Sequence, residues 1–238
     1  MAIFSAASEQ KISGLDGTML KLIAMVSMLI DHIGDIFFPD ALWMRFLGRI
    51  AMPVFAFCIS EGCIHTRSRR RYVLRLGIFA VVSEAPFDLA FNGGIDLTHQ
   101  NIMLTFALAV IAMTLWDAAV SVKDIPSPLR IAGGLSAVLG ICIIASLLGA
   151  DYGFFGVGTV FIFYLMHRRP NWQRVACGVG FVVLLHTHTV HTGTVFSLIP
   201  LIFYNRRKGR GLKWLFYAFY PGHLLVLFLI HMFIQTAA

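Results

Sequence analysis

The segment that decides the fold is Ile23 to Phe38, IAMVSMLIDHIGDIFF. With Thr18 to Leu22 it forms an apolar run long enough to cross most of a bilayer, yet it contains Asp31, His32 and Asp35. A charged side chain in hydrocarbon costs several kcal/mol, so such residues usually face a bundle interior or a water-filled cavity. We therefore expect the rest of the chain to form a shell around a functional site on this helix.

The spacing of the three polar residues limits how they pair. Asp31 and Asp35 are four positions apart and His32 and Asp35 three apart, so all three share a broad helical face. Asp31 and His32 are adjacent and cannot pair well on one helix. If a carboxylate orients His32, the candidates are Asp35 or a carboxylate from another helix.

The composition predicts an all-α, polytopic transmembrane bundle. Of 238 residues 58% are hydrophobic and 13% charged, and the mean hydropathy is +0.79, which excludes an ordinary soluble domain. We expect residues 1–16 to form a polar lead and 17–238 a single transmembrane domain. The net charge is +7. The basic residues that produce it lie in short loops, so they indicate how the chain is oriented in the membrane, and we expect no nucleic-acid partner. The first apolar run lacks a cleavable signal pattern and is expected to be a retained helix.

Neither the cysteines nor the histidine-rich run predicts a metal site. The cysteines show no CxxC pairing and are expected to be small buried hydrophobes; they are Cys58, Cys63, Cys142 and Cys177. The run HTHTVH contains His186, His188 and His191, without a carboxylate or cysteine nearby in sequence. Imidazoles at a wet helix end are common without metal, so we expect none.

The hydropathy pattern predicts nine membrane spans. The segment 193–205 is short for a full crossing and could be tilted, re-entrant or fused with its neighbour. The predicted segments are 18–38, 42–64, 72–91, 101–120, 130–149, 153–167, 172–189, 193–205 and 213–234.

Basic residues occupy every second loop between these segments. The basic loops are 64–72, 118–130, 168–172 and 204–213, whereas the alternate loops carry little Lys or Arg. The positive-inside rule then predicts a cytoplasmic N-terminus and an external C-terminus in a bacterial cytoplasmic (inner) membrane.

This orientation places several polar residues at one depth, in the outer half of the membrane. Each charge alone would be costly there, so a joint network of four carboxylates and two guanidinium groups is expected. The residues are Asp31, Asp35, Arg45, Arg49, Glu84 and Asp88, with Asn101 at the outer end of the fourth segment. In the last segment Tyr217, Tyr220 and His223 recur at three-residue spacing, and Pro221 and Gly222 are expected to open the helix toward a cavity.

The chain resembles the TraX family, named for a conjugation-system protein that N-acetylates pilin subunits. The resemblance runs from about Leu15 to Leu227 and rests on the motifs LDGTMLKLIAMVSMLIDHIG, RFLGRIAMPVFAFCISEGCIHT, RRRYVLRLGIFAVVSEAPFDLAF, NIMLTF, DYGFFGVG and YPGHLLVL. It implies an integral-membrane acyltransferase that moves an acetyl group from cytoplasmic acetyl-CoA to an amine or hydroxyl of a peptide, lipid or glycan. The resemblance also implies that six residues matter: Asp31, His32, Arg49, Glu61, Tyr220 and His223.

For this chemistry His32 is the first candidate, as the base or nucleophile, with Asp31 or Asp35 holding its tautomer. His223 is the rival, with Tyr220 donating to a developing oxyanion. The alternative for each histidine is a structural hydrogen bond inside the bundle.

Other residues are expected to bind the donor or the acceptor. Donor roles fall on Arg49, Glu61, His65, Arg69, Arg70, Arg206 and Arg207, and acceptor roles on Glu84, Asp88, Asn101 and Tyr152. Arg49 could instead be a counter-ion for Asp31 and Glu84, Tyr152 could cap a helix, and the basic loops could serve only topology and contact with anionic lipids.

Two other functions remain open on the sequence alone. A proton-coupled transporter would use the same buried charges as a relay, although no inverted repeat is visible. A non-catalytic assembly protein would bind no coenzyme. The acceptor and the oligomeric state are not predicted.

Overall fold

The computed structural model describes residues 14–185 and 189–237, and these residues form helices without a strand. The all-α prediction is therefore confirmed over the described residues. The elements are α1 (Gly17–Phe37), α2 (Leu42–Gly48), α3 (Ala51–His65), α4 (Arg69–Asn92), α5 (Ile102–Ser121), α6 (Ser127–Leu147), α7 (Gly153–Leu165), α8 (Asn171–Leu185), the 3-10 helix η1 (Thr189–Ser197), α9 (Leu198–Ile202) and α10 (Lys213–Ala237).

The chain is a membrane protein built from apolar helices. Four described helical stretches are long and apolar enough to cross a membrane. They are α5, α6, α10 and the stretch Leu42–His65, which comprises α2 and α3. Helices α1 and α4 are of similar length but carry charges. Six predicted segments correspond to α1, α4, α5, α6, α7 and α10 within a few residues of the predicted bounds.

The predicted second segment is broken between α2 and α3, at Arg49 and Ile50. Ser27 of α1 stabilises the break, because its hydroxyl donates to the carbonyl of Leu47 at 2.7 Å and lies 3.1 Å from that of Gly48. The N–H of Ile50 also donates to the Leu47 carbonyl, at 3.3 Å, so the backbone of the break is satisfied from two sides. On either side of the break, Arg45 and Arg49 both reach Asp31 of α1.

The seventh predicted segment corresponds to α8, whose described part is about 22 Å long at 1.5 Å per residue, less than the roughly 30 Å of a bilayer core. The eighth segment becomes η1 followed by the five-residue α9. Asn171, which opens α8, donates through Nδ2 to the carbonyl of Leu201 at 2.8 Å, so this part of the chain returns to the side where α8 begins.

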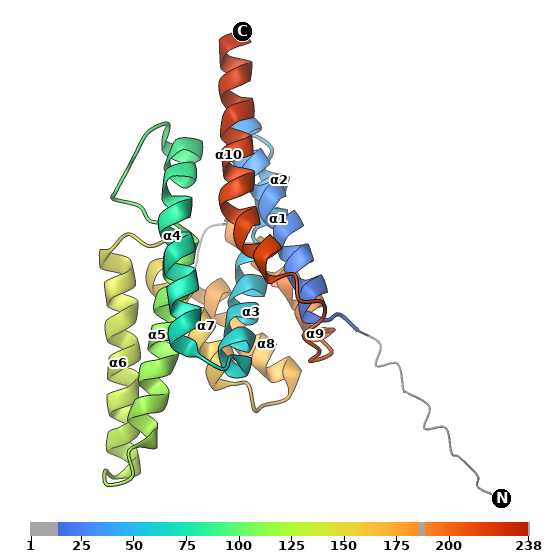
Figure 1. Cartoon of the computed structure of the whole chain (residues 1–238). Helices are drawn as coiled ribbons and strands as arrows, with labels where there is room; N and C mark the ends of the chain where they lie inside the picture. Colours follow the sequence, from blue (N-terminus) through green and yellow to red (C-terminus); the bar gives the residue numbers. More distant parts are fainter. Residues whose placement is uncertain (1–13, 186–188, 238) are drawn as a thin grey trace, which may run out of the picture.

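The helices pack around α3, α7 and the lower part of α10 (Figure 1). Helix α10 lies against α4 and α1, and α3 lies against α1 and α7. Helices α5 and α6 form a pair at one flank. Fully buried apolar side chains fill the centre, among them Val54, Phe57, Val110, Val157, Phe163 and Leu224.

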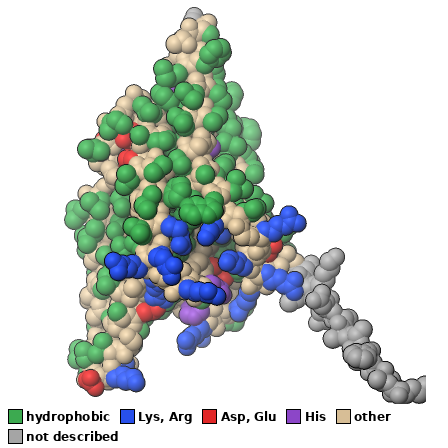
Figure 2. All heavy atoms as spheres, viewed as in Figure 1, with side chains coloured by type: hydrophobic (Ala, Val, Ile, Leu, Met, Phe, Trp, Pro, Cys, Tyr) green, Lys and Arg blue, Asp and Glu red, His purple; other side chains and the backbone are tan. Residues whose placement is uncertain are grey.

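Charge is distributed unevenly along the bundle. Lys and Arg gather in a belt across the lower half of the view in Figure 2, below a broad hydrophobic face. The start of α1 belongs to this basic end, because the N–H of Gly17 donates to the carbonyl of Arg207 at 2.8 Å.

Three of the four cysteines are buried as predicted, at Cys58, Cys63 and Cys142. Cys177 is exposed, and the prediction for it was wrong, because α8 turns this residue away from the bundle.

Candidate functional site

The two rival histidines form one pair. Nδ1 of His32, on α1, lies 2.9 Å from Nε2 of His223, on α10. Their rings are nearly parallel, with an interplanar angle of 13° and 5.0 Å between centroids. The sequence treated the two as alternatives because they are 191 positions apart, and the packing of α10 against α1 unites them.

The pair is oriented by a backbone carbonyl. Nδ1 of His223 lies 2.8 Å from the carbonyl oxygen of Phe219, one turn earlier. A carbonyl only accepts, so this nitrogen carries the hydrogen, and Nε2 of a neutral His223 is an acceptor. His32 must then donate through Nδ1, which leaves its Nε2 with a lone pair. The arrangement gives His32 the tautomer of a general base.

Aromatic rings fix the pair from both sides. The edge of Phe91 from α4 meets the ring of His32 at 5.0 Å between centroids, and Phe219 stacks on His223 at 4.5 Å. Helix α10 runs continuously through Pro221. The predicted opening of the helix at Pro221 and Gly222 is therefore wrong, and the histidine is positioned by an intact helix.

The carboxylates of α1 pair with arginines. Asp31 lies 3.3 Å from Nη1 of Arg45 and 3.6 Å from Nη1 of Arg49, and Asp35 lies 3.2 Å from Arg45. The expected pairing of His32 with Asp31 or Asp35 is not what the structure contains, since His32 bonds His223. The ion pairs flank the histidine pair and place fixed charges beside it.

The close approach of α1 and α2 depends on Gly48. A Cβ at this position would lie 2.2 Å from Cβ of Asp31, inside any allowed contact distance. Glycine therefore lets Asp31 enter between Arg45 and Arg49, and this crossing builds the ionic half of the site.

These groups line one cavity of about 350 Å³, a size typical of small-molecule sites. Its lining includes Asn92, at the end of α4, and His99, in the α4–α5 loop. Its polar lining residues are Asp31, His32, Asp35, Arg45, Arg49, Asn92, His99, Asp151, Tyr152 and Tyr220, and aromatic walls come from Phe55, Phe87, Phe91 and Phe106.

The loop between α6 and α7 supplies a further wall. The N–H of Asp151 donates to the carbonyl of Gln100 at 2.8 Å, so this loop is held beside the start of α5. Tyr152 adopts a left-handed conformation, with φ of 59°, and its hydroxyl accepts from Nη1 of Arg49 at 3.2 Å. Burial raises the pKa of Asp151 to about 6, and the nearby Arg49 partly opposes this.

Tyr220 is buried at the cavity wall. A phenol has one hydrogen to donate, so a tyrosine in this place is compatible with the predicted role as a donor to an oxyanion.

The remaining outer carboxylates form separate contacts. Asn101 caps α5 and bonds Glu84 through its side chain, and its Nδ2 also donates to the carbonyl of Ala80 at 2.8 Å. Asp88 accepts from the N–H of Asp96 at 3.0 Å. The predicted single network is therefore wrong: Glu84 is not the partner of Arg49, and this second group anchors the α4–α5 loop.

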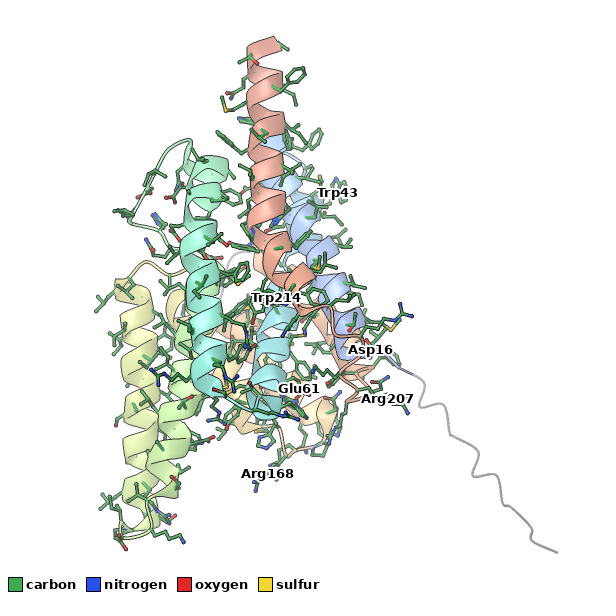
Figure 3. All side chains as sticks on the ribbon, in the orientation of Figure 1. Asp16, Trp43, Glu61, Arg168, Arg207 and Trp214 are labelled. Carbon is green, nitrogen blue, oxygen red and sulfur yellow. The ribbon has the colours of Figure 1, made fainter. Side chains whose placement is uncertain are left out.

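Glu61 belongs to a different, closed cluster nearer the basic end (Figure 3). Both of its oxygens are engaged, Oε1 by Nη1 of Arg174 at 2.6 Å and Oε2 by the hydroxyl of Tyr204 at 2.9 Å. Arg174 also donates to Ser60 at 2.9 Å and to the carbonyl of Phe163 at 2.7 Å. The cluster ties α3 to α8 and to the end of α9.

The predicted donor-binding arginines divide into paired and exposed groups. Arg69 lies 2.6 Å from Asp117, and its Nη2 donates to the hydroxyl of Tyr164 at 2.8 Å. Arg70, Arg206 and Arg207 are exposed. His65 is exposed and its Nδ1 lies 2.9 Å from the carbonyl of Glu61, within its own helix.

The histidine run HTHTVH falls largely outside the part of the chain that the structure describes. His186 and His188, and the side chain of His191, lie outside the described residues. Over residues 14–185 and 189–237 there is no group of three or more His, Cys, Asp or Glu residues that could hold a metal ion.

Comparison with known proteins places the chain in a family. The family model described as TraX protein matches residues 16–231. The chain belongs to the TraX family. The match includes α1 to α9 and most of α10, so it covers every helix that contributes to the histidine pair and its cavity.

Three relatives illustrate the range of the family. The chain is 29% identical to a "Probable fimbrial assembly protein FimC, serogroup H1" of Dichelobacter nodosus, over 91% of this chain and 96% of the relative. It is 26% identical to "Protein TraX" of Escherichia coli (strain K12), over 77% and 71%. An uncharacterized protein of Rickettsia prowazekii (strain Madrid E) is 54% identical over 79% and 68%. No solved structure matches the chain.

Sequence reasoning missed several residues of these clusters. Arg174 and Asp117 were overlooked because a charge near a segment end was attributed to topology or left out. Asp151 was noted only as part of the DYG motif, although an acid next to a predicted outer helix end could have suggested it. Arg45 was placed in the network but given no role at the site.

Proposed function

We propose that the protein is an integral-membrane acyltransferase that moves an acetyl group from acetyl-CoA to an amine or hydroxyl acceptor. The observation that carries this proposal is the chain of contacts from the Phe219 carbonyl through His223 to His32, at the wall of a cavity. A lone-pair nitrogen held by a second group is the arrangement that general-base catalysis needs.

In the proposed step, Nε2 of His32 takes the proton from the acceptor while the acceptor nitrogen or oxygen attacks the thioester carbonyl. The new N–C or O–C bond forms and the C–S bond breaks. The resulting imidazolium of His32 is stabilised through Nδ1–H by Nε2 of His223, and it returns the proton to the departing coenzyme A thiolate. The histidine pair ends the cycle in its starting state.

Two further groups support this chemistry. Tyr220 is proposed to donate its O–H to the developing oxyanion, because it is buried at the wall of the same cavity as His32. Arg49 and Tyr152 are proposed to shape the acceptor side of the cavity. The contacts of Arg45 and Arg49 with Asp31 keep the local charge balanced, so a neutral thioester and acceptor meet no unpaired ion.

The proposed topology has the basic end in the cytoplasm and the cavity opening at the outer face of a bacterial inner membrane. Exposed Trp214, at the start of α10, and exposed Trp43, on α2, lie at different heights in Figure 3, as expected for interfacial anchors at two membrane surfaces. The proposed topology puts the N- and C-termini on opposite sides, and it does not require α8 and η1–α9 to cross fully, because Asn171 at the start of α8 contacts Leu201 of α9. We propose about nine membrane spans.

The donor is proposed to bind first at the basic end. Exposed Arg70 and Arg71, at the start of α4, are free of ion pairs among the described residues, and they offer cations for the phosphates of coenzyme A. For Glu61 we propose a structural role in place of donor binding, because both of its carboxylate oxygens accept hydrogen bonds within the bundle, from Arg174 and Tyr204.

The experiment that tests the proposal is calorimetric titration of the detergent-purified full chain with acetyl-CoA and, separately, free coenzyme A. We expect saturable binding of both, weakened about tenfold by the double variant Arg70→Glu/Arg71→Glu, since each reversal replaces an attraction by a repulsion. Arg168→Glu/Arg169→Glu, in the basic loop 168–172, is the matched control and should bind normally. Absence of binding to well-folded parent protein would reject the acyl-CoA function and make proton-coupled transport the working hypothesis.

The acceptor is proposed to be a component of a surface structure, since one relative carries the name of a fimbrial assembly protein. A peptide amine that reaches the cavity from the outer side would fit this proposal. Transfer of labelled acetyl from acetyl-CoA to candidate surface subunits in reconstituted vesicles would identify it, and labelling of lipid alone would contradict a peptide acceptor.

A further inference from the structure

A second hollow, of about 590 Å³, lies between the start of α1, the α2–α3 break and η1–α9. Its side chains are apolar and include Leu15, Ile23, Ile50, Phe196, Ile199 and Phe203. Phe196, Ile199 and Phe203 are 46%, 58% and 62% exposed. In a membrane protein such a surface faces hydrocarbon, so the hollow is a slot for an apolar chain and is unsuited to a polar substrate.

The slot is closed at the basic end by paired backbone. The N–H of Leu15 donates to the carbonyl of Phe203 at 2.9 Å, and the N–H of Asn205 donates to the carbonyl of Leu15 at 2.9 Å. Gly14 permits this contact, because its φ is 142° and a Cβ there would lie 2.6 Å from the Phe203 oxygen. The slot therefore has a fixed floor directly beside the basic segment that follows Phe203.

The basic segment that follows Phe203 lies directly beside the floor of the slot, and its charges are free. It comprises Arg206, Arg207, Lys208 and Arg210, all exposed and without an ion pair among the described residues. The backbone of this segment is held by α1, because the Thr18 hydroxyl donates to the carbonyl of Arg210 at 2.8 Å. Figure 3 shows Arg207 next to Asp16 at the start of α1. Asp16 is committed to capping α1, where it accepts from the N–H groups of Thr18 and Met19 at 2.9 Å.

We propose that this slot binds one acyl chain of an anionic phospholipid whose phosphate lies on the basic segment 206–210. An apolar slot that ends at a cluster of cations matches an amphiphile with a negative head group. The apolar slot beside it distinguishes the basic segment from Arg70 and Arg71, which we propose as the binding site for the phosphates of coenzyme A. Arg206 and Arg207 then hold lipid in place of the donor-binding role predicted from the sequence. The inference does not depend on acyl transfer.

The test is native mass spectrometry of the detergent-purified full chain, titrated with phosphatidylglycerol or with phosphatidylcholine of the same acyl chains. We expect a discrete one-to-one adduct with phosphatidylglycerol, formed at least about tenfold more tightly than with phosphatidylcholine. Arg206→Gln/Arg207→Gln should reduce the preference to near unity. Arg168→Gln/Arg169→Gln removes the same charge from another loop and should leave it intact.

A second pair of variants tests the slot itself. Ile199→Trp should fill the slot and weaken binding of both lipids, whereas Leu229→Trp, on the exposed face of α10, should not. Equal binding of the two lipids by the parent protein would overturn the proposal. So would an adduct that appears only after deletion of residues 1–13, because the slot would then hold this chain's own N-terminal segment. Loss of acetyl-CoA binding in Arg206→Gln/Arg207→Gln, with the lipid preference retained, would return these arginines to the donor site.

Discussion

The bundle contains two polar clusters that differ in how much of their hydrogen-bonding capacity is used. The cluster of Glu61, Arg174 and Tyr204 is closed, since both carboxylate oxygens and three guanidinium nitrogens have protein partners. The His32–His223 pair lies at a cavity and leaves Nε2 of His32 without a described partner. A buried charge is therefore a weak sign of function by itself, whereas unused hydrogen-bonding capacity beside a cavity is a strong one.

The largest expected effect is loss of transfer at the open cluster. His32→Ala should reduce the rate of acetyl transfer by roughly a thousandfold, because it removes the base, while the amount of folded protein stays the same. The rate is followed as release of the coenzyme A thiol. His231→Ala, near the exposed end of α10, is the control and should act like the parent protein. Retained turnover in His32→Ala would move the reaction away from this pair.

Substitutions in the closed cluster should lower the stability of the protein. Arg174→Met leaves Glu61 as an unpaired buried charge and should lower the free energy of unfolding by about 3–5 kcal/mol, while transfer per folded molecule changes little. The double variant Glu61→Met/Arg174→Met removes both charges and should recover much of the loss. Denaturant titration in detergent measures both. If the double variant is as unstable as the single one, the ion pair is not the source of the effect.

His223 should behave as a positioning residue for His32. His223→Gln should lower the transfer rate by about ten- to a hundredfold, less than His32→Ala, because the base remains but loses its fixed tautomer. The pH profile of the rate should also move, a change that a packing defect alone would not produce. An unchanged profile with a reduced amount of folded protein would assign His223 a structural role.

The smallest expected effect concerns Asp151 at the cavity wall. Burial raises the pKa of this carboxyl to about 6, so between its ordinary range and about 6 the folded protein binds more protons than the unfolded chain. Its contribution to stability therefore falls as pH rises through that window. The melting temperature of Asp151→Asn relative to the parent protein should rise from about pH 5 to about pH 8. A constant difference across this range would contradict the raised pKa.

Much of the fold could be predicted because hydrophobic runs and basic loops are local signals. The break at Arg49 and Ile50 could not, because it depends on Ser27 from another helix. The short α8 and η1–α9 pair was indicated only by the length of the eighth segment. At the site, both histidines and the α1 carboxylates were found from their cost in hydrocarbon.

The sequence could not show which polar side chains contact one another across helices. Proximity along one helix suggested Asp31 or Asp35 for His32, whereas common depth suggested Asp31 and Glu84 for Arg49, and of these two only Asp31 is its partner. The structure pairs His32 with His223 and Arg49 with Asp31 and Tyr152. These contacts join helices far apart in sequence, and the crossing that decides them depends on a single missing side chain, at Gly48.

The most direct test of the account is release of the coenzyme A thiol from acetyl-CoA by purified parent protein and by His32→Gln, at matched amounts of folded protein. The account predicts slow hydrolysis of the thioester by the parent protein, faster release when an acceptor is added, and neither in His32→Gln although acetyl-CoA still binds. Equal thiol release by the two proteins would contradict the assignment of His32 as the reacting base.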